Sequence, residues 1–159
     1  MKWESVGTLN CSVARTLSVV GDRWTLLILR NAFLGTRRFD DFQTHLGMTR
    51  HLLAERLKRM VEAGIFRKEA YQANRFEYRL TAKGKALYPV ILAMTAWGDA
   101  WMDEGKGPPI LYVHKDCGKT VTPTVACPEC HKPMGAHDVI PMAGPGLAGG
   151  QELEAVGDV

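Results

Sequence analysis

The stretch that most constrains the fold runs from Phe39 to Gly64 and has the pattern of two short helices joined by a tight turn. After Thr49, a good helix cap, apolar residues recur at three- and four-residue steps and lie along one stripe of a helix. Gly47 tolerates the left-handed conformation at the end of the preceding helix. This pattern fits a helix-turn-helix, whose second helix can enter a DNA major groove, and it also fits an ordinary helical hairpin.

The charge of the chain is unevenly distributed. The formal net charge is only +3, but residues 37–85 contain twelve Lys or Arg against six Asp or Glu, whereas residues 105–159 contain four against six. No run approaches the ~20 apolar residues of a membrane span, and the first residues lack the pattern of a signal peptide. We therefore expect a cytoplasmic protein with no membrane partner, whose cysteines are free, metal-bound or redox-active rather than bridged.

Further elements are expected on both sides of the helix-turn-helix. The spacing predicts helices over 11–20 and 22–34, strands over 65–71 and 76–80, and a long helix over 82–104. The two strands would form a basic hairpin whose turn contains Asn74, a residue that tolerates positive φ. Pro89 lacks a backbone N–H and should kink or divide the long helix.

The long helix carries an apolar stripe that exceeds what a small domain needs to close its core. Aromatic anchors of the kind found at its end are typical of protein interfaces. The stripe predicts a homodimer interface, with an intramolecular core as the alternative. Its members are Leu87, Val90, Ile91, Met94, Trp97 and Trp101.

A metal-binding pattern follows residue 105: HKDC, nine residues, then CPEC. Two pairs of ligands, each separated by two residues, can supply a tetrahedral structural zinc site, and the intervening GKTVTPTVA can form two short strands. His131 and His137 are alternative ligands. A reduced cysteine cluster, or a disulfide from the first pair to the second, is the competing interpretation. The candidate ligands are His114, Cys117, Cys127 and Cys130.

Cys11 lies at the start of the first expected helix, where amide dipoles lower the pKa of a thiol. Accessible cysteines of low pKa react with oxidants and electrophiles, so Cys11 is a candidate redox sensor. The alternative is a small buried apolar residue.

Between Cys11 and Trp97 the chain resembles the HxlR-type winged-helix transcription regulators of bacteria. The motifs GDRW, RRF and YRLTAKG, at these separations and in this order, carry the resemblance. It implies a homodimeric repressor or activator that binds pseudo-palindromic double-stranded operator DNA and responds to an oxidant, an electrophile or a small aromatic ligand. Many relatives have a proline just before the second strand of the wing; here the turn is Gln72 to Arg75.

The resemblance also implies a set of DNA-binding residues. The recognition helix would present Thr49, Arg50, His51, Glu55 and Lys58 to the major groove, with Arg50 and His51 as the readers of base edges. The cations expected at phosphates, where affinity falls with salt, are Arg37, Arg38, Arg67, Lys68 and Arg75.

The expected fold class is mainly α (α+β), a winged helix-turn-helix with a long dimerisation helix and a small cysteine-containing C-terminal β extension. The winged-helix and dimerisation domain would occupy 1–104, the extension 105–140 and a flexible tail 141–159. Two other functions compete: a thiol oxidoreductase using CPEC, and a small-molecule-binding module at the apolar dimer interface. With no nucleotide-binding Gly loop and no Ser/His/Asp constellation, we expect no enzyme.

Overall fold

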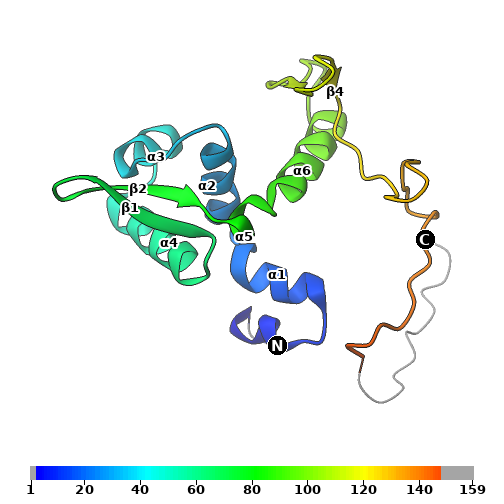
Figure 1. The fold of residues 1–159 in the computed structure, drawn as a ribbon, viewed down its shortest axis with the longest axis horizontal. Helices are drawn as coiled ribbons and strands as arrows, with labels where there is room; N and C mark the ends of the chain where they lie inside the picture. The colour runs from blue at the N-terminus through cyan, green and yellow to red at the C-terminus, as the bar shows by residue number, and fades with distance from the viewer. Residues whose placement is uncertain (1–2, 148–159) are drawn as a thin grey trace. The chain divides into compact units, whose positions relative to one another are not determined.

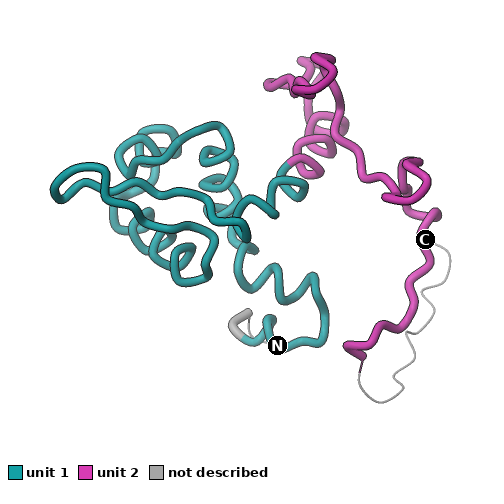
Figure 2. The backbone as a smooth tube through the Cα atoms, viewed as in Figure 1, with its two compact units in different colours: residues 1–91 teal, residues 92–159 magenta. Residues whose placement is uncertain are grey.

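The computed structural model describes residues 3–147. It comprises two compact units, residues 1–91 and 92–159, and the boundary falls inside the last long helix (Figure 2). The predicted tail beyond residue 147 lies outside the described residues. None of the helices within residues 3–147 is long and apolar enough to span a membrane.

Figure 1 shows the elements in chain order. They are a 3₁₀ helix η1 (Trp3–Thr8), α1 (Ser12–Val20), α2 (Arg23–Phe33), α3 (Phe39–Leu46), α4 (Arg50–Glu62), β1 (Phe66–Gln72), β2 (Arg75–Leu80), α5 (Ala82–Lys85), α6 (Tyr88–Trp101), β3 (Tyr112–Val113) and β4 (Thr120–Val121). The mixed α and β content agrees with the predicted fold class; η1 was not predicted.

Helix α2 is the central element of the first unit, as its apolar sequence predicts. Asp22 caps it by accepting hydrogen bonds from the backbone N–H groups of Trp24 and Thr25, at 3.0 and 3.1 Å. Ile28 and Leu29 are completely buried. A helix buried on this much of its surface fixes the positions of the helices that pack around it.

The helix-turn-helix is formed by α3 and α4. Gly47 ends α3 in the left-handed region at φ +63°, and the Thr49 hydroxyl accepts a hydrogen bond from the Leu52 N–H at 3.4 Å, which caps α4. The inner stripe of α4 packs Leu53 and Leu57 into the core, both with no exposed surface. The sequence prediction of two helices, their turn and their buried faces is confirmed.

The hairpin of β1 and β2 is the wing. The strands pair antiparallel from Phe66↔Leu80 to Ala70↔Phe76, and the register shifts before the turn at Ala73 and Asn74, where Asn74 has φ +58°. The segment before α3 extends this sheet, because the Tyr78 N–H donates to the Arg37 carbonyl at 2.8 Å. The wing and the helix-turn-helix are therefore joined by backbone hydrogen bonds.

The long helix predicted over 82–104 is divided into α5 and α6, as the position of Pro89 indicates. Pro89 lies in the first turn of α6, where a missing N–H breaks no helical hydrogen bond. Thr81 fixes α5: its hydroxyl donates to the Gly64 carbonyl at 2.6 Å and accepts from the Gly84 N–H at 3.1 Å. Ile91 is the last residue of the described chain whose side chain is buried.

The second unit has little regular structure after α6. Strands β3 and β4 pair antiparallel, with Tyr112 opposite Val121 and Val113 opposite Thr120. The prediction of two strands between Cys117 and Cys127 is wrong: β4 lies there, but its partner precedes His114. The strands flank the first ligand pair because the tight turn itself occupies residues 114–119.

Candidate nucleic-acid interface

The outer side of α4 is polar, as the sequence predicts. His51 and Lys58 are exposed, and Glu55 is half-buried. Two ion pairs run along this side, between Arg59 and Glu55 at 2.6 Å and between Lys58 and Glu62 at 3.7 Å. Pairs of this kind on an exposed helix face are worth about 0.3–0.5 kcal/mol, so DNA can replace them at little cost.

Arg50 is held against α3 rather than extended from α4. Its guanidinium lies 3.1 Å from the Asp40 carboxylate, 3.2 Å from the Gln43 side-chain oxygen and 4.9 Å from the centre of the Phe39 ring. The side chains of Arg50 and Asp40 are 69% and 82% exposed, so solvent screens their attraction. Arg50 can therefore leave Asp40 for a stronger acceptor.

A groove of about 410 Å³ lies between the start of α3, the start of α4 and the wing. Cations from all three elements line it: Arg38, Arg50, Lys68 and Arg75. The Arg38 guanidinium lies over the Tyr71 ring at 4.8 Å, and the Lys68 ammonium lies over the Phe76 ring at 4.1 Å. Asp40 and Asp41 are the acidic members of the lining.

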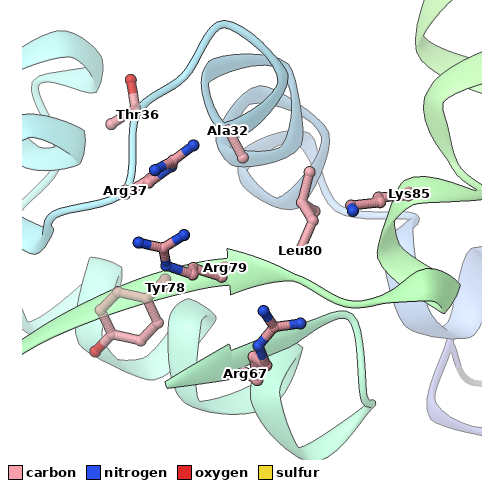
Figure 3. Close-up of a pocket in the computed structure, with 8 residues that line it drawn as sticks. All are labelled: Ala32, Thr36, Arg37, Arg67, Tyr78, Arg79, Leu80 and Lys85. Atoms are coloured by element: carbon pink, nitrogen blue, oxygen red, sulfur yellow. The ribbon is translucent and has the colours of Figure 1, made fainter. Parts of the chain in front are cut away.

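A second group of cations surrounds a separate pocket of about 170 Å³ beside β2 (Figure 3). Glu69 and Glu77 partly neutralise this group, since Arg79 lies 2.9 Å from one and 3.0 Å from the other. Arg67 donates to Glu69, and this hydrogen bond lowers the pKa of the Glu69 carboxyl against the opposing effect of desolvation. The cations of this group are Arg37, Arg67, Arg79 and Lys85.

The cations predicted at phosphates are thus divided between two places. Arg38, Lys68 and Arg75 line the groove, whereas Arg37 and Arg67 line the pocket beside β2. Arg67 and Lys68 separate because successive side chains of a strand point to opposite faces.

Sequence reasoning missed Arg56, which faces back toward α2. Its guanidinium lies 3.5 Å from the Asp22 carboxylate, and its side chain is 20% exposed. It also missed Lys85 as a member of the second cationic group. Arg79, which the sequence places beside the hairpin tip with Arg67 and Lys68, lies opposite Arg67 in the paired strands.

Cys11 is the N-cap residue of α1, with φ −143° and ψ 123°, and its side chain makes no capping hydrogen bond. The thiol is free and exposed. The alternative interpretation, a small buried apolar residue, is therefore wrong.

The predicted metal ligands form two pairs. The His114 Nδ1 lies 3.4 Å from the Cys117 Sγ, and hydrogen bonds from the Cys130 and Glu129 backbone and from the Cys130 side chain lower the pKa of the Cys127 thiol. The two pairs are separate: among residues 3–147 no three metal-ligating side chains lie close enough to share an ion. No helix begins at CPEC, unlike the usual redox-active pair.

Comparison with known proteins identifies relatives of the first unit and of most of the chain. The model of the HxlR-like helix-turn-helix family matches residues 19–106. An uncharacterized HTH-type transcriptional regulator of Mycobacterium tuberculosis strain H37Rv, Rv3095, is 43% identical over 138 residues, which cover 86% of this chain and 87% of the relative. A match of that extent cannot be contained in residues 1–104, so it includes part of the extension.

Solved structures are also similar in fold. The crystal structure of PA1607, described as a candidate transcription factor, is 37% identical with a TM-score of 0.76 and covers 86% of this chain and 96% of PA1607. The redox regulator HypR in its reduced form is 30% identical with a TM-score of 0.53, covering 57% of this chain and 92% of HypR.

Proposed function

Because the chain belongs to the HxlR-like helix-turn-helix family and its relatives are transcriptional regulators, we propose that it binds double-stranded operator DNA in the cytoplasm as a homodimer. The observation that carries the proposal is the groove at the start of α4, where four cations from α4, the wing and the segment before α3 line one surface. Helix α4 would enter the major groove, and the wing tip would reach the adjacent backbone.

We propose different tasks for these cations. Arg38, Lys68 and Arg75 line the groove and would contact phosphates, while Arg50 and His51, at the first turn of α4, would read base edges. Arg37 and Arg67 line the pocket beside β2 and would contact phosphates outside the groove. Arg67 would contribute less to DNA affinity, because it is paired with Glu69. The full proposed interface is Arg37, Arg38, Thr49, Arg50, His51, Glu55, Lys58, Arg67, Lys68 and Arg75.

The homodimer is proposed from exposed apolar side chains. On α6, Met94, Trp97 and Trp101 are 50%, 60% and 76% exposed, and on α1 Val13 is 67% exposed. Large apolar side chains that gather on an exposed helix mark interaction sites. A second copy of the chain is the occupant that a two-fold operator would require, because each subunit presents one reading helix.

A mobility-shift titration tests DNA binding. The probe is the intergenic fragment upstream of the gene, and a scrambled fragment of the same length is the matched control. We expect a shift that favours the native fragment and that weakens steeply as salt rises from 50 to 200 mM, on the order of 10³-fold for about six phosphate contacts. Equal affinity for both fragments would contradict a specific regulator.

We also propose that Cys11 senses oxidants. Its free, exposed thiol at the start of α1 supports this, as does the likeness to HypR, which is a redox regulator. One equivalent of hydrogen peroxide would convert the thiol to a sulfenic acid with release of one water. Mass spectrometry should find this oxidation at Cys11, and operator binding by Cys11→Ser should no longer respond to peroxide. An equal response in Cys11→Ser would exclude Cys11 as the sensor.

A small-molecule effector is a compatible second role. A pocket of about 370 Å³ in the first unit is lined by apolar residues including Val19, Val20 and Leu87. Arg15 and Lys83 also line this pocket. Apolar walls with a few cations suit a small aromatic carboxylate. Benzoate should raise the melting temperature of wild type more than that of Lys83→Ala; no shift in wild type at any concentration would remove this role.

A further inference from the structure

The extension contains two turns that repeat the same backbone geometry, residues 114–119 and 127–132. In both, the N–H of the first residue donates to the carbonyl of the sixth at 2.9 Å. The N–H of the fifth residue donates to the carbonyl of the first, at 2.8 Å in one turn and 2.9 Å in the other. We call these turns the first and the second knuckle.

The similarity extends to the residues on either side and to the backbone inside each turn. Antiparallel bridges close both knuckles, Val113 with Thr120 and Ala126 with Pro133. The fifth residue is left-handed in each, Gly118 at φ +67° and His131 at φ +58°. Two segments with different sequences thus form one type of turn twice within twenty-one residues.

The predicted ligands are at the same two positions of each knuckle, the first and the fourth. In the first knuckle these residues are His114 and Cys117, whose Nδ1 and Sγ atoms lie 3.4 Å apart. In the second they are Cys127 and Cys130. A tight turn with ligands at its first and fourth residues is how Cys-x₂-Cys pairs supply half of a tetrahedral site.

The extension needs a stabilising link that its side chains do not supply. No side chain between residues 92 and 147 is buried, and β3 and β4 are two residues long. Val113 and Val125 are each 57% exposed. Segments of about forty residues without an apolar core are usually held by metals or disulfides, and all three thiols of the knuckles are free.

We propose that the two knuckles bind one structural Zn²⁺ through His114, Cys117, Cys127 and Cys130. Three thiolates and one imidazole are a soft donor set that suits tetrahedral zinc rather than magnesium or calcium. The two pairs do not meet within residues 3–147 as described, so binding one ion requires them to close together. Only nine residues separate Cys117 from Cys127, so this closure costs little chain entropy. Four protein ligands leave no open position, which makes the ion structural and not catalytic.

The repeat favours the first and fourth positions of each knuckle over the alternative ligands, His131 and His137. His131 corresponds to Gly118, a residue that has no side chain, so the knuckle geometry requires no ligand at that position. Histidine is tolerated there because it adopts positive φ more readily than most residues. His137 lies outside both knuckles.

Elemental analysis of the full-length protein tests the proposal. Protein purified under reducing conditions without chelator should contain about one zinc per chain. His114→Ala, Cys117→Ser, Cys127→Ser and Cys130→Ser should each lower that ratio below about half after dialysis. The matched controls are His131→Gly and His137→Ala, which should keep the metal; loss in His131→Gly equal to that in Cys117→Ser would overturn the ligand assignment.

A thiol titration supplies a second readout that does not depend on any variant folding. Of the four cysteines, only Cys11 lies outside the knuckles, so one thiol should react rapidly in the zinc-loaded wild type and four after addition of a chelator. Four reactive thiols before the chelator, stoichiometric iron in place of zinc, or a disulfide joining the knuckles in the isolated protein would each overturn the proposal. These readouts are independent of DNA binding.

Discussion

The carboxylate of Asp22 lies 3.5 Å from the guanidinium of Arg56 and joins the start of α2 to the inner side of α4. The same carboxylate caps α2 through the Trp24 and Thr25 N–H groups. The pair is largely shielded, with Arg56 20% and Asp22 29% exposed. One side chain of the GDRW motif therefore fixes both the central helix and the helix that we propose reads DNA.

The two roles of Asp22 can be separated by substitution. Asp22→Asn keeps a good N-cap but loses the ion pair, whereas Asp22→Ala loses both. We expect Asp22→Ala to lower the free energy of unfolding by roughly 2–4 kcal/mol and Asp22→Asn by about 1–2 kcal/mol, measured by urea denaturation. Equal losses in the two variants would show that the cap contributes nothing.

Position 84 requires glycine because its surroundings leave no room for a side chain, and not because of its backbone φ angle. A Cβ at this position would collide with the Ile65 carbonyl and would lie 3.0 Å from Leu80 Cδ2. Gly84→Ala should therefore destabilise the first unit by about 1–3 kcal/mol, as overpacking does, in a thermal or urea unfolding experiment.

The matched control for Gly84 is Gly98, which also lies in a helix but has open space around it. Gly98→Ala should be neutral or stabilising by up to about 1 kcal/mol, because alanine favours the helix. Equal effects of the two substitutions would contradict the packing role of Gly84.

Asp40 holds Arg50 against α3 in the free protein. Asp40→Ala should change the free energy of unfolding by less than about 1 kcal/mol, because the pair is exposed, and should raise operator affinity by releasing Arg50. Asp41→Ala removes the same charge from the same groove without releasing Arg50. If mobility shifts show equal gains in both variants, the gain is due to charge alone.

Trp101 should contribute to the homodimer and not to the core of one chain. Trp101→Glu should shift the sedimentation of the protein from dimer toward monomer and lower operator affinity, since an aromatic anchor would be lost. Ile140→Glu is the control, because Ile140 is a comparably exposed apolar residue, 84% against 76%. A monomeric wild type at micromolar concentration would contradict the dimer.

The sequence predicted the elements that local chemistry determines. Gly47, Thr49 and Asn74 each impose a local conformation, and the structure has the expected turn, cap and wing tip at these residues. Pro89 likewise restricts the local backbone, and the predicted long helix is divided into α5 and α6. These predictions depend on one or two residues and need no knowledge of tertiary contacts.

The candidate site was predicted less completely because it depends on contacts between distant residues. The Arg50–Asp40 pair joins residues ten apart on different helices, and the Asp22–Arg56 pair joins residues further apart still. Arg67 and Lys68 lie on opposite faces because side chains alternate along β1, but which of the two lines the groove depends on how the wing packs against the rest of the first unit. No periodicity in the sequence shows these relationships.

The salt dependence of operator binding tests the central claim most directly. The triple variant of Arg38, Lys68 and Arg75 to alanine removes the cations of the groove outside α4, and a control triple of Lys106, Lys115 and Lys119 to alanine removes the same charge from the second unit. We expect the slope of log affinity against log salt to fall in magnitude by about 2–3 in the groove variant and to stay unchanged in the control. Equal slopes in the groove variant and wild type would contradict the proposed interface.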